Sequence, residues 1–66
     1  MKNRIKIERA IHEMTQADLA EEIGVSRQTI NSIEKGKYVP STVLSLKLAK
    51  VFGKEVGELF VLEEGD

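Results

Sequence analysis

Residues 15–37, TQADLAEEIGVSRQTINSIEKGK, decide the fold of this chain because they read as two short helices joined by a turn. Thr15 stands three residues before Asp18, the spacing of a capping box that begins a helix. Gly24 ends that helix, since a helix C-terminus commonly needs a residue that tolerates positive φ. Ser26 is then the N-cap of a second helix. Two short helices on either side of a Gly-containing turn predict a helix-turn-helix unit.

The second predicted helix carries a polar face made of hydrogen-bonding groups. At about 100° per residue, one arc of roughly 140° holds polar side chains and no carboxylate, while the opposite side can pack inward. The polar arc holds Arg27, Gln28, Asn31, Ser32 and Lys35, and the opposite side holds Thr29, Ile30 and Ile33. Arg can form two hydrogen bonds with guanine, Asn and Gln can do so with adenine, and Ser serves either base. Any amphipathic surface helix has a polar face. The absence of Asp and Glu from this one, in a chain with 11 acidic residues, favours a DNA-reading face.

The charge distribution adds to this reading, although the formal net charge of −1 lacks the basic footprint of many DNA-binding proteins. The acidic excess lies in the C-terminal part of the chain. Arg27, Lys35 and Lys37 form a local basic stripe on the second helix and just after it. A mildly acidic protein with such a stripe is expected to bind DNA with a strong salt dependence.

Length and composition indicate one domain. Sixty-six residues with 41% hydrophobic content give a small core, so the chain benefits from a partner subunit. The chain has no cysteine, and His12 is its one histidine, a surface or half-buried residue rather than a ligand, so neither a metal nor another cofactor is expected. There is no combination of nucleophile and base and no phosphate-binding Gly-rich loop, which argues against an enzyme. No apolar run has the length of a membrane span or of a signal-peptide core, so the protein is expected to be soluble and cytoplasmic.

A set of residues in and around the motif follows a highly specific spacing. After an Arg in the preceding helix, the pattern is TQ-x-x-LA-x-x-x-G-V-S-x-x-x-I-x-x-x-E-x-G. The matching residues are Arg9, Thr15, Gln16, Leu19, Ala20, Gly24, Val25, Ser26, Ile30, Glu34 and Gly36. In this pattern the chain resembles the helix-turn-helix family of phage repressors and Cro proteins, often called the XRE family. The helical run LSLKLAKVFG extends the resemblance over nearly the whole chain, as in the small one-domain members.

The resemblance implies an all-α fold, a five-helix lambda-repressor-like domain over residues 1–66 with the helix-turn-helix motif at about 15–35. It also implies an ion pair between Arg9 and Glu34 that ties the first helix to the end of the recognition helix. Breaking one partner of such a pair costs more than the pair is worth, because the other charge stays partly buried.

The expected DNA contacts fall into two classes. Four residues on the recognition helix are expected to read bases: Arg27, Gln28, Asn31 and Ser32. Five residues are expected to contact the DNA backbone: Gln16, Lys35, Lys37, Tyr38 and Ser41. Gln16 stands in the first turn of its helix, where the helix N-terminus helps to bind phosphate.

Apolar spacing predicts the rest of the scaffold. The first helix is expected to bury Ile7, Ala10, Ile11 and Met14, which recur at helical intervals, whereas the commonest family pattern has an apolar residue where Glu8 stands. A fourth helix begins after Ser41 and ends at Gly53, and its core candidates are Val43, Leu44, Leu48, Val51 and Phe52, with Leu46 left over. A short fifth helix is expected over residues 55–59.

The two ends of the chain are expected to pair. Lys2–Lys6 and Phe60–Glu64 are both able to form strands, and termini often lie close together, which predicts a small antiparallel β-ribbon. Such a ribbon is marginal alone and needs packing against helices or a partner. Leu59, Val61 and Leu62 are therefore predicted to form a two-fold dimer interface, with the face of the fourth helix around Leu46 as the alternative site.

Together these features predict a sequence-specific DNA-binding transcriptional regulator, a repressor that binds an inverted-repeat operator in double-stranded DNA as a homodimer. No small-molecule domain is evident, and no membrane partner is expected. The alternative is an antitoxin-like or other protein-interaction module in which DNA binding is secondary.

Overall fold

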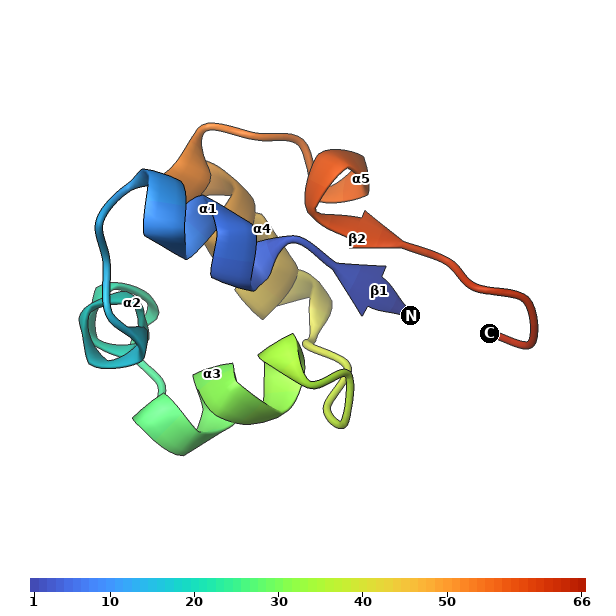
Figure 1. The fold of residues 1–66 in the computed structure, drawn as a ribbon, viewed down its shortest axis with the longest axis horizontal. Helices are drawn as coiled ribbons and strands as arrows, with labels where there is room; N and C mark the ends of the chain where they lie inside the picture. Colours follow the sequence, from blue (N-terminus) through green and yellow to red (C-terminus); the bar gives the residue numbers. More distant parts are fainter.

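The computed structural model describes residues 1–66 as five helices and a two-stranded antiparallel sheet (Figure 1). The fold is therefore mostly helical with a small terminal ribbon, as predicted. The elements are β1 (Lys2–Asn3), α1 (Ile5–Ile11), α2 (Gln16–Ile23), α3 (Arg27–Glu34), α4 (Thr42–Phe52), α5 (Val56–Leu59) and β2 (Phe60–Val61).

The helix-turn-helix unit forms where local side chains begin and end the helices. The Thr15 hydroxyl accepts a hydrogen bond from the backbone N–H of Asp18, and the Asp18 carboxylate accepts one from the backbone N–H of Thr15, which completes the predicted capping box. Gly24 ends α2 at a φ of 74°, a left-handed conformation that favours glycine. The Ser26 side chain caps α3, and the Ser41 side chain caps α4.

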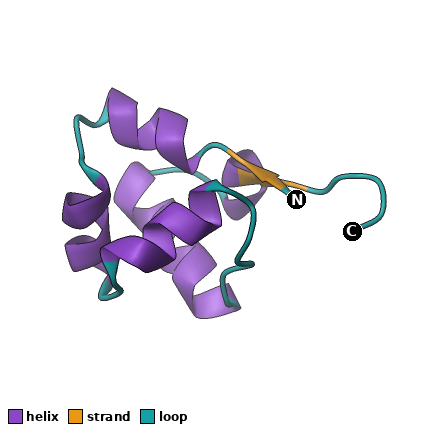
Figure 2. Ribbon diagram, turned by 60° about the horizontal axis from the view of Figure 1, so that its bottom comes forward, coloured by secondary structure: helices purple, strands orange, loops and turns teal.

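The core lies where the five helices meet (Figures 1 and 2). Its buried members come from every helix, which is why the unit can hold α3 firmly although the domain is small. They are Ile5, Leu19, Ala20, Ile23, Ile30, Ile33, Leu48, Ala49, Phe52 and Leu59.

The predicted buried face of α1 is wrong. Ile7 is 48% exposed and Ile11 is 64% exposed, and Ala10 is exposed as well, while Ile5 and Glu8 are buried instead. Ile7 lies about 200° around the helix from Ile5, so one of the two must face outward. Met14 is partly buried against the core, but α1 ends at Ile11, so Met14 does not continue its periodicity.

The start of α1 is set by a side chain outside the helix. The Asn3 carbonyl oxygen accepts a hydrogen bond of 3.2 Å from the backbone N–H of Ile5, one of the N–H groups that have no partner within the helix. The helix therefore begins at Ile5, and the ribbon is shorter than predicted. Lys2 pairs with Val61 and Asn3 pairs with Phe60, while Ile5 and Lys6 belong to α1.

Two further residues differ from the sequence expectation. Leu59, predicted at a dimer interface, is fully buried in the core of its own chain because it ends α5 on the inner side. Val43, predicted in the core, is exposed because it lies about 140° around α4 from the buried Leu48. Leu48 and Phe52 are buried as predicted, and Leu44 and Val51 are partly buried.

Candidate nucleic-acid interface

The face of α3 that points away from the core carries the polar side chains. Ile30 and Ile33 anchor the opposite side of α3 in the core, and Thr29 is partly buried beside them. Outward, Arg27 and Gln28 are exposed, and Asn31 and Ser32 are partly buried. A shallow hollow is lined by Arg27, Gln28 and Asn31, so three of the four predicted base-reading residues are brought together on one surface. These groups can donate and accept hydrogen bonds in the manner that base edges require.

The segment after α3 folds back along the helix. The backbone N–H groups of Lys37 and Tyr38 both donate to the carbonyl of Ser32, over 2.9 Å and 3.3 Å. Gly36 makes this turn possible with a φ of 72°. As a result Tyr38 lines a second hollow on the same helix, together with Ser26, Gln28, Thr29 and Ser32.

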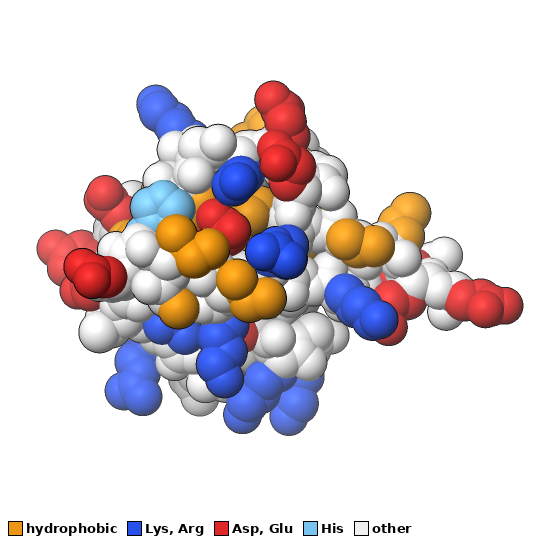
Figure 3. Space-filling model, turned by 45° about the horizontal axis from the view of Figure 1, so that its top comes forward, with side chains coloured by type: hydrophobic (Ala, Val, Ile, Leu, Met, Phe, Trp, Pro, Cys, Tyr) orange, Lys and Arg blue, Asp and Glu red, His pale blue; other side chains and the backbone are white.

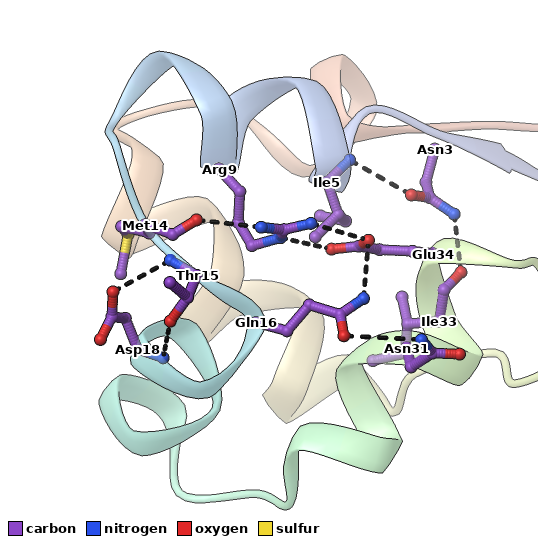
Figure 4. A network of polar contacts seen from close by, with 10 residues as sticks. All are labelled: Asn3, Ile5, Arg9, Met14, Thr15, Gln16, Asp18, Asn31, Ile33 and Glu34. Carbon is purple, nitrogen blue, oxygen red and sulfur yellow. Dashed lines mark hydrogen bonds and ion pairs between the residues drawn. The ribbon is translucent and has the colours of Figure 1, made fainter.

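A chain of polar contacts joins α1, α2 and α3 beside this face (Figure 4). Arg9 pairs with Glu34, whose Oε1 accepts a second hydrogen bond, of 3.2 Å, from the side-chain amide of Gln16. The amide oxygen of Gln16 in turn lies 3.5 Å from the side-chain nitrogen of Asn31. Glu34 raises the pKa of Arg9, chiefly by hydrogen bonding to its guanidinium, so Arg9 stays charged.

Gln16 takes part in this network. Its side-chain amide is partly buried and engaged with Glu34 and Asn31, so the geometry gives it a role in holding the recognition helix. Its predicted contact with phosphate stays a prediction.

Sequence reasoning missed Lys6, which lines a third hollow between α1 and α3. The other residues around this hollow are Arg9, Gln16, Asn31, Glu34 and Lys35. Lys6 stands far from the motif in sequence, and only the packing of α1 against α3 brings its positive charge there. It joins Lys35 as a candidate backbone contact at the edge of the reading face.

Ser41 lies just before α4. Its hydroxyl oxygen accepts a 3.1 Å hydrogen bond from the backbone N–H of Leu44 at the start of α4, and it lines none of the hollows on α3. Ser41 therefore caps α4, and its predicted contact with the DNA backbone stays a prediction.

Charge is unevenly distributed over the face of the molecule that Figure 3 shows. Lys and Arg side chains gather along the lower edge of the space-filling view, on the side where α3 lies in Figure 1, and Asp and Glu side chains lie mainly toward the sides and top (Figure 3). The carboxylate beside the reading face belongs to Glu34, which Arg9 neutralises. A polyanion approaching α3 therefore meets a surface of opposite, positive charge.

Metal sites and membrane-spanning helices can each be recognised from the geometry of side chains and helices. No cluster of three or more His, Asp or Glu side chains has the arrangement of a metal site. None of the helices is long and apolar enough to span a membrane.

Comparisons with known proteins agree with this geometry. The family model for the helix-turn-helix domain matches residues 5–59. An uncharacterised HTH-type transcriptional regulator of Methanocaldococcus jannaschii is 53% identical over 66 residues, which cover 100% of both chains. The uncharacterised HTH-type transcriptional regulator YgzD of Bacillus subtilis is 48% identical over 64 residues, which cover 97% of both chains.

Solved structures give the same result. The restriction-modification controller protein C.AhdI of Aeromonas hydrophila superposes with a TM-score of 0.78 at 33% identity, covering 86% of both chains. The SOS-response transcriptional repressor LexA of Eubacterium rectale superposes with a TM-score of 0.80 at 31% identity, covering 94% of this chain and 66% of the other. With its capped motif, its outward polar face and these relatives, the chain belongs to the helix-turn-helix family of phage repressor and Cro (XRE) type, a family of DNA-binding transcriptional regulators.

Proposed function

We propose that the chain acts as a sequence-specific transcriptional repressor, with residues 1–66 as a single DNA-binding domain that binds an inverted-repeat operator as a homodimer. The observation that carries the proposal is the carboxylate-free outer face of α3, held outward by the buried Ile30 and Ile33. An α-helix with Arg, Gln, Asn and Ser on its outer side fits the major groove and its hydrogen-bonding pattern.

The roles of individual residues follow from their exposure and chemistry. Arg27, Gln28, Asn31 and Ser32 read base edges. The DNA backbone is held around the reading face by the five residues predicted for it, Gln16, Lys35, Lys37, Tyr38 and Ser41, and Lys6 is added from α1 beside Lys35. Repression is supported by the name of one structural neighbour, an SOS-response transcriptional repressor.

The dimer is supported by the apolar surface next to the terminal ribbon. Val61 is 50% exposed and Leu62 is 76% exposed, although both side chains are large and apolar. Contact of this surface with its two-fold copy would remove apolar area from water. For the proposed operator, the dimer must hold its two recognition helices about 34 Å apart, one turn of B-DNA. With Leu59 buried in its own core, the proposed interface consists of Val61 and Leu62.

Selection of bound fragments from random double-stranded DNA tests the binding mode. The wild-type protein should enrich an inverted repeat whose half-site centres lie about one helical turn apart. An Arg27→Ala/Gln28→Ala variant, with the same fold and dimer surface, should not enrich that sequence. Enrichment of a single asymmetric site, or of no sequence at all, would contradict the proposal. Placing the selected operator across a promoter should lower reporter expression, and a rise in expression would assign activation instead.

Sedimentation of charged variants tests the interface. A Val61→Glu/Leu62→Glu variant should sediment as a monomer, keep its helical circular dichroism and lose operator binding. Leu46→Glu is the control, because it places a carboxylate on an exposed apolar residue of α4. If only the Leu46 variant becomes monomeric, the interface lies on α4.

A second candidate function is a protein-interaction module of the antitoxin kind. The exposed apolar residues Ile7 and Ile11 on the outer side of α1 favour it, because neighbouring apolar side chains on a surface often mark a protein contact. In that case the chain should co-purify in fixed stoichiometry with the product of a neighbouring gene, and Ile7→Lys/Ile11→Lys should release that partner.

A further inference from the structure

Asn3 links three elements of the fold through one side chain. Its backbone pairs with Phe60 in the ribbon, and its side-chain oxygen accepts the N–H of Ile5 at the start of α1. Its side-chain nitrogen donates a 2.8 Å hydrogen bond to the backbone carbonyl of Ile33, in the last turn of α3 (Figure 4). A residue of the ribbon thus holds the recognition helix directly.

The carbonyl of Ile33 is well placed for this purpose. It belongs to the last carbonyls of α3, which have no partner within the helix, and it accepts a second bond of 3.0 Å from the N–H of Gly36. The Ile33 side chain is buried, so its backbone cannot shift freely. The next residue, Glu34, forms an ion pair with Arg9 of α1. The last turn of α3 is therefore fastened to the ribbon and to α1 at adjacent residues.

We propose that Asn3 is a positioning residue that sets the orientation of the recognition helix relative to the dimer surface. This inference rests on the proposed function, in which Val61 and Leu62 lie at the two-fold axis. Val61 pairs with Lys2, the residue before Asn3, so the path from the dimer surface to α3 is one strand pair and one side-chain hydrogen bond. A small rotation along this path changes the separation and angle of two recognition helices, because the two-fold axis applies it to both.

Asn3 is chemically suited to the two contacts that it makes. A side-chain amide donates through nitrogen and accepts through oxygen, and here it does both at once, toward Ile33 and Ile5. Aspartate can accept from Ile5 but cannot donate to Ile33. Asn3→Asp therefore keeps the start of α1 and removes the link to α3, whereas Asn3→Ala removes both without adding a charge.

The experiment measures binding to a series of operators in which the selected half-sites are moved apart or together by single base pairs. Wild-type protein should prefer one spacing by about tenfold or more, because each added base pair rotates and shifts the second half-site and must be absorbed by DNA deformation. Asn3→Asp and Asn3→Ala should flatten this preference to about threefold or less while they keep the base preference within each half-site. Asp18→Ala is the matched control, since it removes a helix cap on α2 and leaves the contacts of Asn3 with α3 intact.

Each outcome supports or overturns the positioning role. A spacing profile that is flattened in both Asn3 variants and unchanged in Asp18→Ala supports it. A profile that keeps its shape while all affinities fall together overturns it, and leaves Asn3 a structural residue. A wild-type protein without any preferred spacing overturns the dimer of the proposed function, and the positioning role with it. If Asn3→Asp does not fold by circular dichroism, the profile of Asn3→Ala distinguishes these outcomes, because this variant adds no carboxylate beside the Ile33 carbonyl.

Discussion

Arg9 and Glu34 meet through two hydrogen bonds, from Nε to Oε2 over 2.6 Å and from Nη2 to Oε1 over 3.1 Å. Their side chains are only 15% and 7% exposed, and Arg9 also donates to the carbonyl of Met14 over 2.9 Å. The pair is largely removed from water and links α1, the loop after it and α3. Loss of either side chain would therefore leave the other charge buried without its partner.

Removing one member of this pair should destabilise the fold. Arg9→Ala or Glu34→Ala should each lower the free energy of unfolding by about 3 kcal/mol, because the remaining charge stays buried without its partner. The double variant should lose less than the sum. Urea denaturation of the four proteins measures the coupling, and Glu21→Ala, an exposed carboxylate on α2, should change stability by about 0.5 kcal/mol or less. Strictly additive losses would mean that the two side chains do not interact in solution.

Base reading and backbone contact should separate by mutation. Arg27→Ala and Gln28→Ala should each lose about 1 to 3 kcal/mol on the best operator and relax the preference at one or two base pairs in each half-site. Lys37→Ala should weaken binding to all sequences alike and reduce the salt dependence. Binding titrations at several salt concentrations, on the operator and on its single-base variants, distinguish the two classes. If the three variants shared one sequence preference and one salt dependence, the assigned roles would be wrong.

Glu8 should lower the stability of the native state. It is 3% exposed, and its Oε1 is buried without a hydrogen-bond partner. Burial of a polar group without a partner is unfavourable, so Glu8→Leu should raise the free energy of unfolding by about 1 to 2 kcal/mol. Thermal and urea unfolding measure the gain, with Glu21→Leu on an exposed site as the control. A loss of stability in Glu8→Leu would show that the carboxylate makes a favourable contact.

Asp18 should make the capping of α2 depend on pH. The hydrogen bond from the backbone N–H of Thr15 lowers the pKa of the Asp18 carboxyl below its ordinary value. A carboxyl whose pKa is lower in the folded protein contributes stability above its unfolded pKa, near pH 4, and loses it as the pH falls through the folded pKa. The unfolding free energy of the wild type should therefore fall more steeply than that of Asp18→Asn below about pH 4. If the unfolding free energies of the two proteins fell in parallel as the pH is lowered, Asp18 would make no such contribution.

Local chemistry explains why much of the fold could be predicted. The caps at Thr15, Ser26 and Ser41 and the left-handed Gly24 depend on residues within a few positions of one another, so the sequence shows them directly. The polar face of α3 follows from helical periodicity alone. The Arg9–Glu34 pair joins residues 25 positions apart, and only the family resemblance indicated it.

The remaining features depend on packing between distant segments. The prediction for the buried side of α1 was wrong because Ile5 and Ile7 lie on nearly opposite faces of the helix, and packing against the other helices places Ile5 in the core. Leu59 belongs to an apolar run whose members look alike in sequence, yet α5 turns this one into the core. Lys6 and Asn3 reach α3 only through tertiary contacts, so no local pattern marks them as part of the site.

The pairing of Lys2 with Val61 also has a consequence for the order of folding. This contact joins positions near the two ends of the chain, so it closes a long loop and carries a high entropic cost. The helices of the motif form from local contacts on a much shorter time scale, and the ribbon should therefore assemble after them. Since Val61 lies in the ribbon, a chain would form its dimer surface only after its recognition helix has packed against the core. Incompletely folded chains would therefore not dimerise.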